Sequence, residues 1–259
     1  MNRSYDGFQL KCIALGSMLI DHIAAVFMER YLSLRGGGSA HLLDTTGMLQ
    51  ALSILERIMR YVGRLSFPLF CFFLVEGFLY TSNRRRYALR LLLFAVLSEV
   101  PFDLAFYKSP FDLFHQNVLF TLLLGFLALW GSQALGRKLE QVLGEKRGIY
   151  GRLLSFLLIG ALAVVCAEWL HTNYGSVGVA TILILYFFRD PTEDGRVRAM
   201  LLGCLILLGS HLMEIFALTD LPLIRRYNGK RGRSMKYFFY LFYPLHLLAL
   251  DLLCRMTGC

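Results

Sequence analysis

The sequence predicts an all-α fold, a polytopic integral membrane bundle of about nine transmembrane helices. Hydrophobic residues make up 56% of the 259 residues and charged residues only 17%, whereas a soluble domain carries about a quarter charged residues. The mean hydropathy is +0.54, and apolar runs recur along the whole chain. These observations exclude a soluble globular protein and a disordered chain. We expect one transmembrane domain over residues 1–259, without a sizeable soluble part.

The apolar runs place the crossings. In chain order they are 10–28, 65–80, 88–107, 118–135, 152–171, 174–188, 199–211, 213–225 and 237–254. The run 118–135 holds no charged residue. Residues 199–225 form either one long tilted helix or two short helices that break near Ser210–His211. Residues 47–61 carry apolar side chains at helical spacing, which predicts an amphipathic helix in the membrane interface.

Basic loops set the expected orientation, because Lys and Arg gather in cytoplasmic loops. The segments 83–86, 137–152 and 189–198 are basic and are expected inside. The basic segment 225–236 is also expected inside, which requires 199–225 to cross twice or to re-enter. We therefore predict a membrane protein with a cytoplasmic N-terminus. One cluster, formed by Arg57, Arg60 and Arg64, does not fit, since it precedes the second crossing on the outer side.

The net charge and the cysteines give no sign of other ligands. The formal net charge of +9 follows from the positive-inside pattern, so we expect no nucleic-acid partner. The six cysteines are scattered, mostly in apolar runs, and show no CxxC or metal-ligand spacing. We predict buried apolar thiols and no metal site.

Lys11 and His22 are the most informative pair of ionisable residues. They are eleven positions apart, which places them about 20° apart around a helix and about 16 Å apart along its axis. A cation near the cytoplasmic surface and a deeper imidazole on the same face suit an elongated anionic ligand that enters from the cytosol. Imidazole titrates near neutrality, so His22 is a candidate general base. The plainer alternatives are a snorkelling Lys11 and an interhelical hydrogen bond by His22.

The last apolar run repeats this layout. Lys236 and His246 are ten positions apart, or about 15 Å along a helix. Aromatic residues fill the stretch between them, Tyr243 among them, and Pro244 frees a backbone carbonyl near the histidine.

Further ionisable residues lie within apolar runs, where each costs at least a few kcal/mol and usually faces the bundle interior. Asp21 is about a quarter-turn from its histidine neighbour, which leaves direct pairing open. Glu76 needs a partner or a proton. Glu99 and Asp103 are one helical turn apart, and Asn117 begins the next apolar run on the same side. These three form either a polar vestibule for an acceptor or a hydrogen-bonded corner.

The segment 227–233 is a compact basic loop that contains Lys230, Arg231 and two glycines. Glycine lets backbone N–H groups approach phosphates, and the cations supply charge. The loop is not a Walker A sequence, so nucleotide hydrolysis is not expected. Positive-inside anchoring explains the loop equally well.

Short motifs follow one another in a fixed order from the first apolar run to the last. They are Lys11-x10-His22, Gly63-Arg64 with Phe67-Pro68 and Glu76-Gly77, Ser98-Glu99-x-Pro101-Phe102-Asp103, Gln116-Asn117 with Thr121, Tyr174-Gly175-x-x-Gly178, Tyr227 to Gly232, and Tyr243-Pro244-x-His246. This pattern resembles the TraX family of membrane proteins, relatives of the conjugative-plasmid pilin N-acetylase. The Lys11-x10-His22 spacing is also similar to the basic-x10-His motif of acyltransferase-3-type transmembrane acyltransferases.

The resemblance implies an integral membrane acetyltransferase of the bacterial cytoplasmic membrane, with acetyl-CoA as cosubstrate. His22 is then the catalytic histidine, either as general base or as carrier of the acetyl group. The acceptor is an unidentified amine or hydroxyl on a pilin-like peptide, a glycan or a small molecule, and membrane lipid surrounds the protein. The expected catalytic residues are His22, Asp21 and Glu76. The expected cofactor-binding residues are Lys11, Lys230, Arg231 and Lys236. The expected acceptor contacts are Arg64, Glu99, Asp103, Asn117, Tyr243 and His246.

Two other functions use the same residues differently. Buried carboxylates and histidines also suit the proton relays of a proton-coupled transporter, although the sequence shows none of the inverted repeats typical of that class. In a non-catalytic membrane assembly factor, the buried polar groups would only join helices to one another.

Overall fold

The computed structural model describes residues 5–36 and 47–258. All regular elements in these two ranges are helices, accompanied by isolated β-bridges that pair Tyr5 with Tyr227 and Gln116 with Thr172. The all-α prediction is therefore confirmed.

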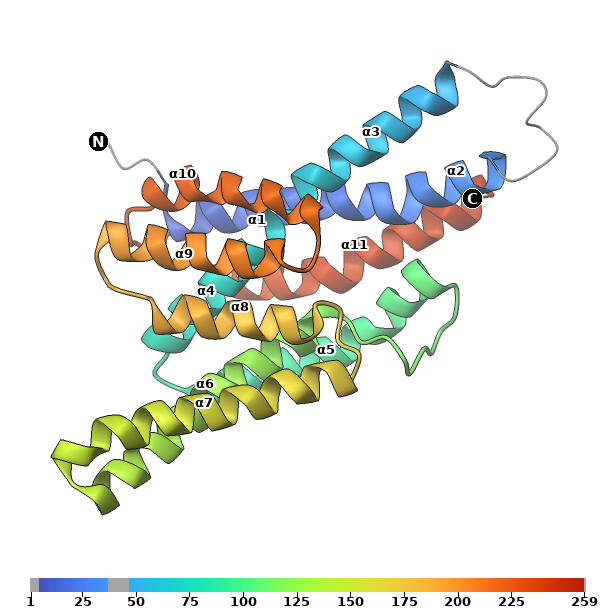
Figure 1. Ribbon diagram of the computed structural model, residues 1–259. Coiled ribbons are helices and arrows are strands. Elements are labelled where there is room, and N and C mark those ends of the chain that lie inside the picture. The colour runs from blue at the N-terminus through green and yellow to red at the C-terminus, as the bar shows by residue number, and fades with distance from the viewer. Residues whose placement is uncertain (1–4, 37–46, 259) are drawn as a thin grey trace. The chain divides into compact units, whose positions relative to one another are not determined.

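The helices follow the apolar runs of the sequence closely (Figure 1). In chain order they are α1 (Gly7–His22), the π-helix η1 (Ile23–Met28), α2 (Glu29–Gly36), α3 (Met48–Gly63), α4 (Ser66–Tyr80), α5 (Arg84–Tyr107), α6 (Val118–Leu143), α7 (Glu145–Trp169), α8 (Gly175–Phe187), α9 (Glu193–Leu208), the 3₁₀-helix η3 (Leu212–Thr219), α10 (Asp220–Arg225) and α11 (Lys236–Thr257).

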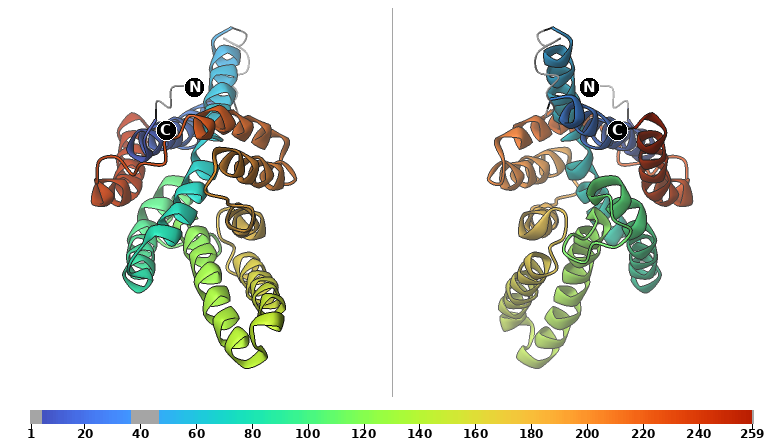
Figure 2. Two further views of the ribbon diagram at one scale, coloured as in Figure 1. Left: turned by 90° about the vertical axis from the view of Figure 1, so that its left-hand side faces the viewer. Right: turned by 90° about the vertical axis from the view of Figure 1, so that its right-hand side faces the viewer.

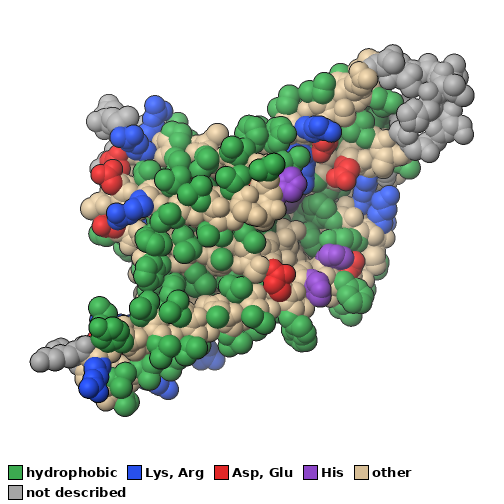
Figure 3. All heavy atoms as spheres, in the orientation of Figure 1, with side chains coloured by type: hydrophobic (Ala, Val, Ile, Leu, Met, Phe, Trp, Pro, Cys, Tyr) green, Lys and Arg blue, Asp and Glu red, His purple; other side chains and the backbone are tan. Residues whose placement is uncertain are grey.

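Several helical runs have the length and composition of membrane spans. Within the described ranges there are five, Gly7–Leu34, Met48–Tyr80, Val118–Leu143, Arg147–Trp169 and Lys236–Thr257, and α8 is a shorter apolar helix. Hydrophobic side chains cover much of the visible surface (Figure 3). The protein is a multi-pass membrane protein, as predicted, whereas the number of about nine crossings stays a prediction.

Side-chain caps mark where several helices begin. Asp6 and Gln9 form a capping box before α1, in which each side chain accepts the backbone N–H of the other residue. Thr192 caps α9 by accepting the N–H of Gly195. At the other end of the chain, α11 stops at Gly258, whose φ of 71° favours glycine.

The segment 199–225 breaks into separate helices, which decides between the two predicted alternatives. α9 ends at Leu208, and the 3₁₀-helix η3 begins at Leu212. The break thus lies at residues 209–211, close to the predicted Ser210–His211. Whether the two pieces cross separately stays a prediction.

The predicted amphipathic helix at 47–61 is α3. Its exposed face carries large apolar side chains, with Ile54, Leu55 and Ile58 between 47% and 59% exposed. Such a face needs an apolar environment, which agrees with a position against lipid.

The chain divides into two compact units. Unit 1 comprises Met1–Leu69, Leu97–Asp112 and Met213–Cys259, and unit 2 comprises Phe70–Val96 and Leu113–Leu212. Each unit is described by itself, and the expectation of a single domain stays a prediction.

In unit 1, α1 packs against α3 and α11. The hydroxyl of Ser17 on α1 donates a 2.7 Å hydrogen bond to the carbonyl of Val62 at the end of α3. This bond fixes the two helices against each other five residues before His22.

In unit 2, α6 and α7 lie side by side along most of their length (Figures 1 and 2). α8 packs against both of them and against α9. A Cβ added at Gly125 of α6 would overlap the buried side chain of Ile182 on α8. Small residues permit such close approach of helices in membranes.

Candidate active site

The first membrane helix changes its winding at His22, which is the last residue of α1. The next six residues form η1, and the N–H of Glu29 bonds the carbonyl of Ala24, five residues earlier. Segments of π-helix within α-helices are costly and frequent at functional sites. His22 therefore lies at an irregular point of a helical run that continues to Leu34.

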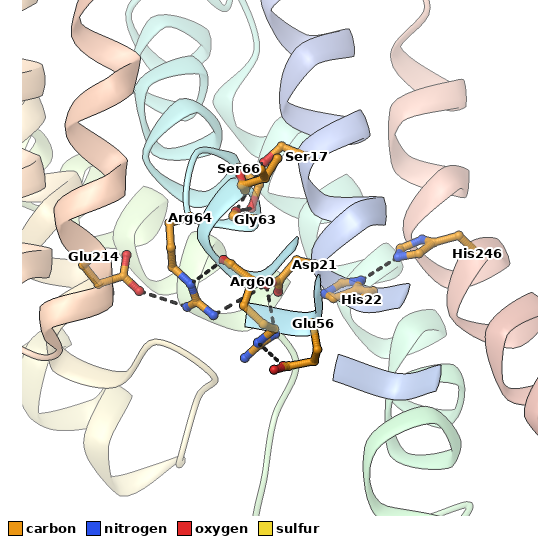
Figure 4. A network of polar contacts seen from close by, with 11 residues as sticks. Ser17, Asp21, His22, Glu56, Arg60, Gly63, Arg64, Ser66, Glu214 and His246 are labelled. Carbon is orange, nitrogen blue, oxygen red and sulfur yellow. Dashed lines mark hydrogen bonds and ion pairs between the residues drawn. The ribbon is translucent and has the colours of Figure 1, made fainter. Parts of the chain in front are cut away.

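His22 meets His246 of α11 across unit 1 (Figure 4). Nδ1 of His22 lies 2.6 Å from Nε2 of His246, and the two rings are parallel with centroids 4.9 Å apart. On its other side, His246 places Nδ1 2.6 Å from the carbonyl oxygen of Phe242. His246 is buried, with 7% of its surface exposed. Sequence analysis predicted both histidines as deep residues but did not predict their contact.

Aromatic rings surround the two histidines. Phe106 of α5 and Tyr243 of α11 approach the His22 ring edge-on, with centroid distances of 5.6 and 6.1 Å. Tyr243 also packs edge-on against His246. The predicted acceptor contact Tyr243 thus lies beside the predicted catalytic histidine, in an apolar setting that strengthens electrostatic interactions.

Lys11 faces α11 as His22 does. Its Nζ atom lies 5.8 Å from the ring centroid of Phe239. Phe239 lies one helical turn after Lys236, the first residue of α11. The first and last membrane helices therefore lie together with a cation near one end of each and a histidine farther along. The helical spacing of both pairs predicted this layout within each helix, but not that the two helices lie together.

The basic loop between α10 and α11 reaches the start of α1. The carbonyl of Lys230 accepts a 2.8 Å hydrogen bond from the N–H of Gly7, and Gly232, with a φ of 67°, lies against Asp6. The side chains of Lys230, Arg231 and Lys236 are exposed. All predicted cofactor-binding cations therefore gather at one end of unit 1.

Asp21 does not orient His22 and binds arginines of the α3–α4 turn instead (Figure 4). Its Oδ1 lies 2.9 Å from Nη1 of Arg60 and 3.5 Å from Nη2 of Arg64. Arg64 also binds Glu214 of η3, with Nη1 and Oε1 2.9 Å apart. Two members of the arginine cluster that did not fit the charge pattern, Arg60 and Arg64, are thus paired within unit 1 with carboxylates from other helices.

Gly63 permits this network. A Cβ at that position would overlap the carboxylate of Asp21. Since any larger residue would displace Asp21, the close approach of α1 and α3 requires glycine here.

Arg30 is a buried charged residue that sequence analysis missed. Its Nη1 lies 3.6 Å from Oδ1 of Asp251 on α11, and its Nη2 donates a 2.9 Å hydrogen bond to the carbonyl of Leu104. The available signal was a lone arginine eight positions after His22 in the same helical run. Arg30 ties this run to α11 and to the end of α5.

Two predicted site residues lie in unit 2. Glu76 is buried and binds the guanidinium of Arg189, with Oε1 2.6 Å from Nε. Asn117 is fully buried and caps α6, since its Oδ1 accepts the N–H of Leu119 and its Nδ2 donates to the carbonyl of Ala95. Both residues hold helices of unit 2 together, and their catalytic and acceptor roles stay predictions.

Asp103 and Glu99 lie on the part of α5 that belongs to unit 1. The Oδ2 atom of buried Asp103 accepts a 2.8 Å hydrogen bond from the N–H of Asp112, and Glu99 is half-buried. These hydrogen bonds favour a structural role for Asp103 and for Asn117, and the acceptor roles of both residues stay predictions.

Two further observations bear on charge and metals. Beyond α8, the N–H of Thr192 donates a hydrogen bond to Asp190, which lowers the pKa of the Asp190 carboxyl. Among the residues that the structure describes, no group of three or more His, Cys, Asp and Glu side chains is placed to hold a metal ion.

Comparison with known proteins decides the family. The family model described as "TraX protein" matches residues 6–254, nearly the whole chain. The chain belongs to the TraX family. This TraX-family protein is also similar to a relative from Dichelobacter nodosus named "Probable fimbrial assembly protein FimC, serogroup H1". The two are 31% identical over 278 residues, which cover 96% of each chain. No solved structure matches.

Proposed function

We propose that this TraX-family protein is a membrane acetyltransferase that moves an acetyl group from cytosolic acetyl-CoA to an amine or hydroxyl. One observation carries the proposal. The histidine of the Lys11-x10-His22 motif meets a second histidine in an apolar setting, on the side of α1 where Lys11 also lies. A nucleophile that attacks a thioester must lose a proton, and a positioned imidazole is the usual group to take it.

The chemistry assigned to His22 is general-base catalysis. His22 takes the proton as the acceptor nitrogen or oxygen forms a bond to the acetyl carbonyl carbon. The bond between that carbon and the CoA sulfur breaks, and the thiolate leaves with the proton that His22 returns. Positioning both substrates where water is scarce supplies much of the acceleration.

The exposed cations at one end of unit 1 are the proposed binding site for the CoA phosphates. Lys11 lies on α1, Lys236 begins α11, and the loop that carries Lys230 and Arg231 bonds the start of α1. The CoA arm would then follow α1 toward His22. A cytosolic ligand requires this end of unit 1 to face the cytoplasm, as the predicted orientation in the bacterial cytoplasmic membrane has it.

The acceptor is proposed to be a peptide of a surface fibre. The relative from Dichelobacter nodosus is named as a probable fimbrial assembly protein, and acetylation of a fibre subunit is a reaction that suits such a relative. Five of the six predicted acceptor contacts share unit 1 with His22, and among them Tyr243 touches its ring and Arg64 binds the neighbouring Asp21. We assign the acceptor contacts first to these two residues.

Release of CoA from acetyl-CoA tests the proposal. The purified protein in detergent is expected to release CoA when given acetyl-CoA and acceptor peptide, and His22→Ala is expected to lose at least about 100-fold in rate. His115→Gln, at an exposed histidine of unit 2, is the matched control and is expected to keep the wild-type rate. Equal rates in His22→Ala and wild type would contradict the proposal.

The name of the relative also favours a second candidate, a non-catalytic assembly factor in which the buried polar groups only join helices. Acetyl-CoA separates the two candidates. A ligand that binds the folded state raises its unfolding temperature, so stabilisation by acetyl-CoA is expected of the enzyme and not of the assembly factor.

A further inference from the structure

We propose that His246 is a positioning residue that holds His22 in the tautomer with the proton on Nδ1 and a free lone pair on Nε2. This inference rests on the proposed function, since it names the atom of His22 that acts as the base. The observation behind it is the chain of contacts that runs from the carbonyl of Phe242 through His246 to His22.

The hydrogen-bond partners determine where the protons lie. The carbonyl of Phe242 only accepts hydrogen bonds, so Nδ1 of His246, at 2.6 Å, must carry a proton and donate it. A neutral imidazole carries one N–H, which leaves Nε2 of His246 as an acceptor. Nδ1 of His22, at 2.6 Å from that atom, must then be the donor. In neutral His22 the remaining nitrogen, Nε2, is unprotonated.

The reverse arrangement fails on the same partners. If neutral His246 donated from Nε2 to His22, its Nδ1 would turn a lone pair toward the carbonyl oxygen of Phe242 at 2.6 Å. Two acceptors at that distance repel each other, and Nδ1 of His246 would be left without a donor in a buried place. The carbonyl is therefore the feature that fixes both rings.

The same chain of contacts offers a second position, on His246, for the positive charge that forms during the reaction. When Nε2 of His22 takes the proton of the acceptor, its Nδ1 proton can pass to Nε2 of His246, so that one positive charge is shared between two rings. Two charged rings whose facing nitrogens lie 2.6 Å apart would repel strongly in an apolar setting, so the pair holds a single added proton. Return of the proton from Nε2 of His22 to the CoA thiolate restores the starting tautomers.

Nothing in the described ranges competes for the free nitrogen. Among the described residues, the contacts of the His22 ring are the hydrogen bond at Nδ1 and the ring contacts with Phe106, Tyr243 and His246. Asp21, the adjacent carboxylate, is held by Arg60 and Arg64. Nε2 is thus left for a substrate.

A graded series of substitutions at His246 tests the positioning role through activity. His246→Gln keeps an amide oxygen near the position of Nε2 and is expected to stay within about 10-fold of the wild-type kcat, whereas His246→Leu keeps the bulk, removes the acceptor and is expected to lose about 100-fold or more. The KM for acetyl-CoA is expected to change little in both, because the cations that bind it are elsewhere. Wild-type kcat in His246→Leu, with His22→Gln inactive, would overturn the inference and leave the proposed function standing.

Nitrogen NMR of the full-length protein in detergent, with ¹⁵N-labelled histidine rings, tests the tautomer without any activity. The His22 signals, assigned as those missing from His22→Gln, are expected to show a protonated Nδ1 and an unprotonated Nε2 in the wild type, and mixed tautomers in His246→Leu. A protonated Nε2 in the neutral wild-type ring would overturn this inference alone. Absence of acetyl transfer by a wild type that has the expected tautomer would instead overturn the proposed function.

Discussion

The residues around His22 divide into those that act on its ring and those that hold its helix. His246 and Tyr243 touch the ring itself. Asp21 binds Arg60 and Arg64 and so connects α1 with the turn after α3. Neighbouring positions in the sequence, 21 and 22, therefore have different tasks, because they point to different sides of one helix.

Removing the charge of Asp21 tests its structural role. Asp21→Asn leaves Arg60 with only a 4.0 Å contact to Glu56 and Arg64 with the contact to Glu214, in a largely buried place, so we expect the free energy of unfolding to fall by about 3 kcal/mol. Unfolding in detergent followed by circular dichroism measures this. The control is Glu140→Gln, which removes a pair with Arg152, a side chain that is 58% exposed. It is expected to change stability by less than about 1 kcal/mol. Equal effects of the two substitutions would contradict the assigned role.

Helix packing in unit 1 depends on a glycine position where a side chain would not fit and on a nearby hydrogen bond. Gly63 lies at the end of α3 directly against Asp21 of α1, and Ser17 bonds the backbone of the same turn. Beyond His22, η1 packs against α11, and Arg30 binds Asp251 of α11 and the carbonyl of Leu104 of α5. The position of His22 is thus fixed by contacts on both sides along the helix.

Glycine-to-alanine substitutions in α3 and in α1 should have opposite effects on stability. Gly63→Ala forces a Cβ into the Asp21 carboxylate and is expected to lower the unfolding temperature in detergent and to slow acetyl transfer. In Gly16→Ala the Cβ enters open space, with no atom within 4 Å. Because alanine favours a helix over glycine by about 1 kcal/mol, this control is expected to be neutral or stabilising. A Gly63→Ala variant as stable and active as the control would refute the close contact.

On the scale of the whole molecule, the order of apolar runs and basic loops defines the expected topology. The exposed Lys230 lies after η3 and α10, and the exposed Arg85 lies after α4. Both belong to basic segments that the charge rule places in the cytoplasm. His115 lies between them in the sequence, in the segment 108–117, which holds a single Lys and is therefore expected outside.

Labelling of introduced cysteines checks this topology in a background without the native cysteines. His115→Cys is expected to react with a membrane-impermeant maleimide in spheroplasts, which expose the outer face of the membrane. Arg85→Cys and Lys230→Cys are expected to react only after permeabilisation. Labelling of Lys230→Cys in sealed spheroplasts would mean that residues 199–225 cross once, and would remove the basic loop from the cytosolic acetyl-CoA site.

Much of this architecture was predictable from the sequence because it depends on local patterns. Long apolar runs gave the helices, one of two predicted alternatives placed a break near Ser210, and helical periodicity placed Lys11 and His22 on one face. The partners were not predictable. His22 and His246 are 224 positions apart, and the arginines that bind Asp21 seemed out of place until the fold brought them to α1. The buried role of Arg30 and the π-helix after His22 also depend on tertiary contacts.

The central claim is that His22 performs the chemistry of an acetyltransferase, and acetyl transfer by His22→Gln tests it most directly. Purified wild type and variant are mixed with radiolabelled acetyl-CoA and acceptor peptide, and label in the peptide is counted. We expect acetyl-CoA to raise the unfolding temperature of both proteins, while only the wild type labels the peptide. Equal labelling by His22→Gln would contradict the account.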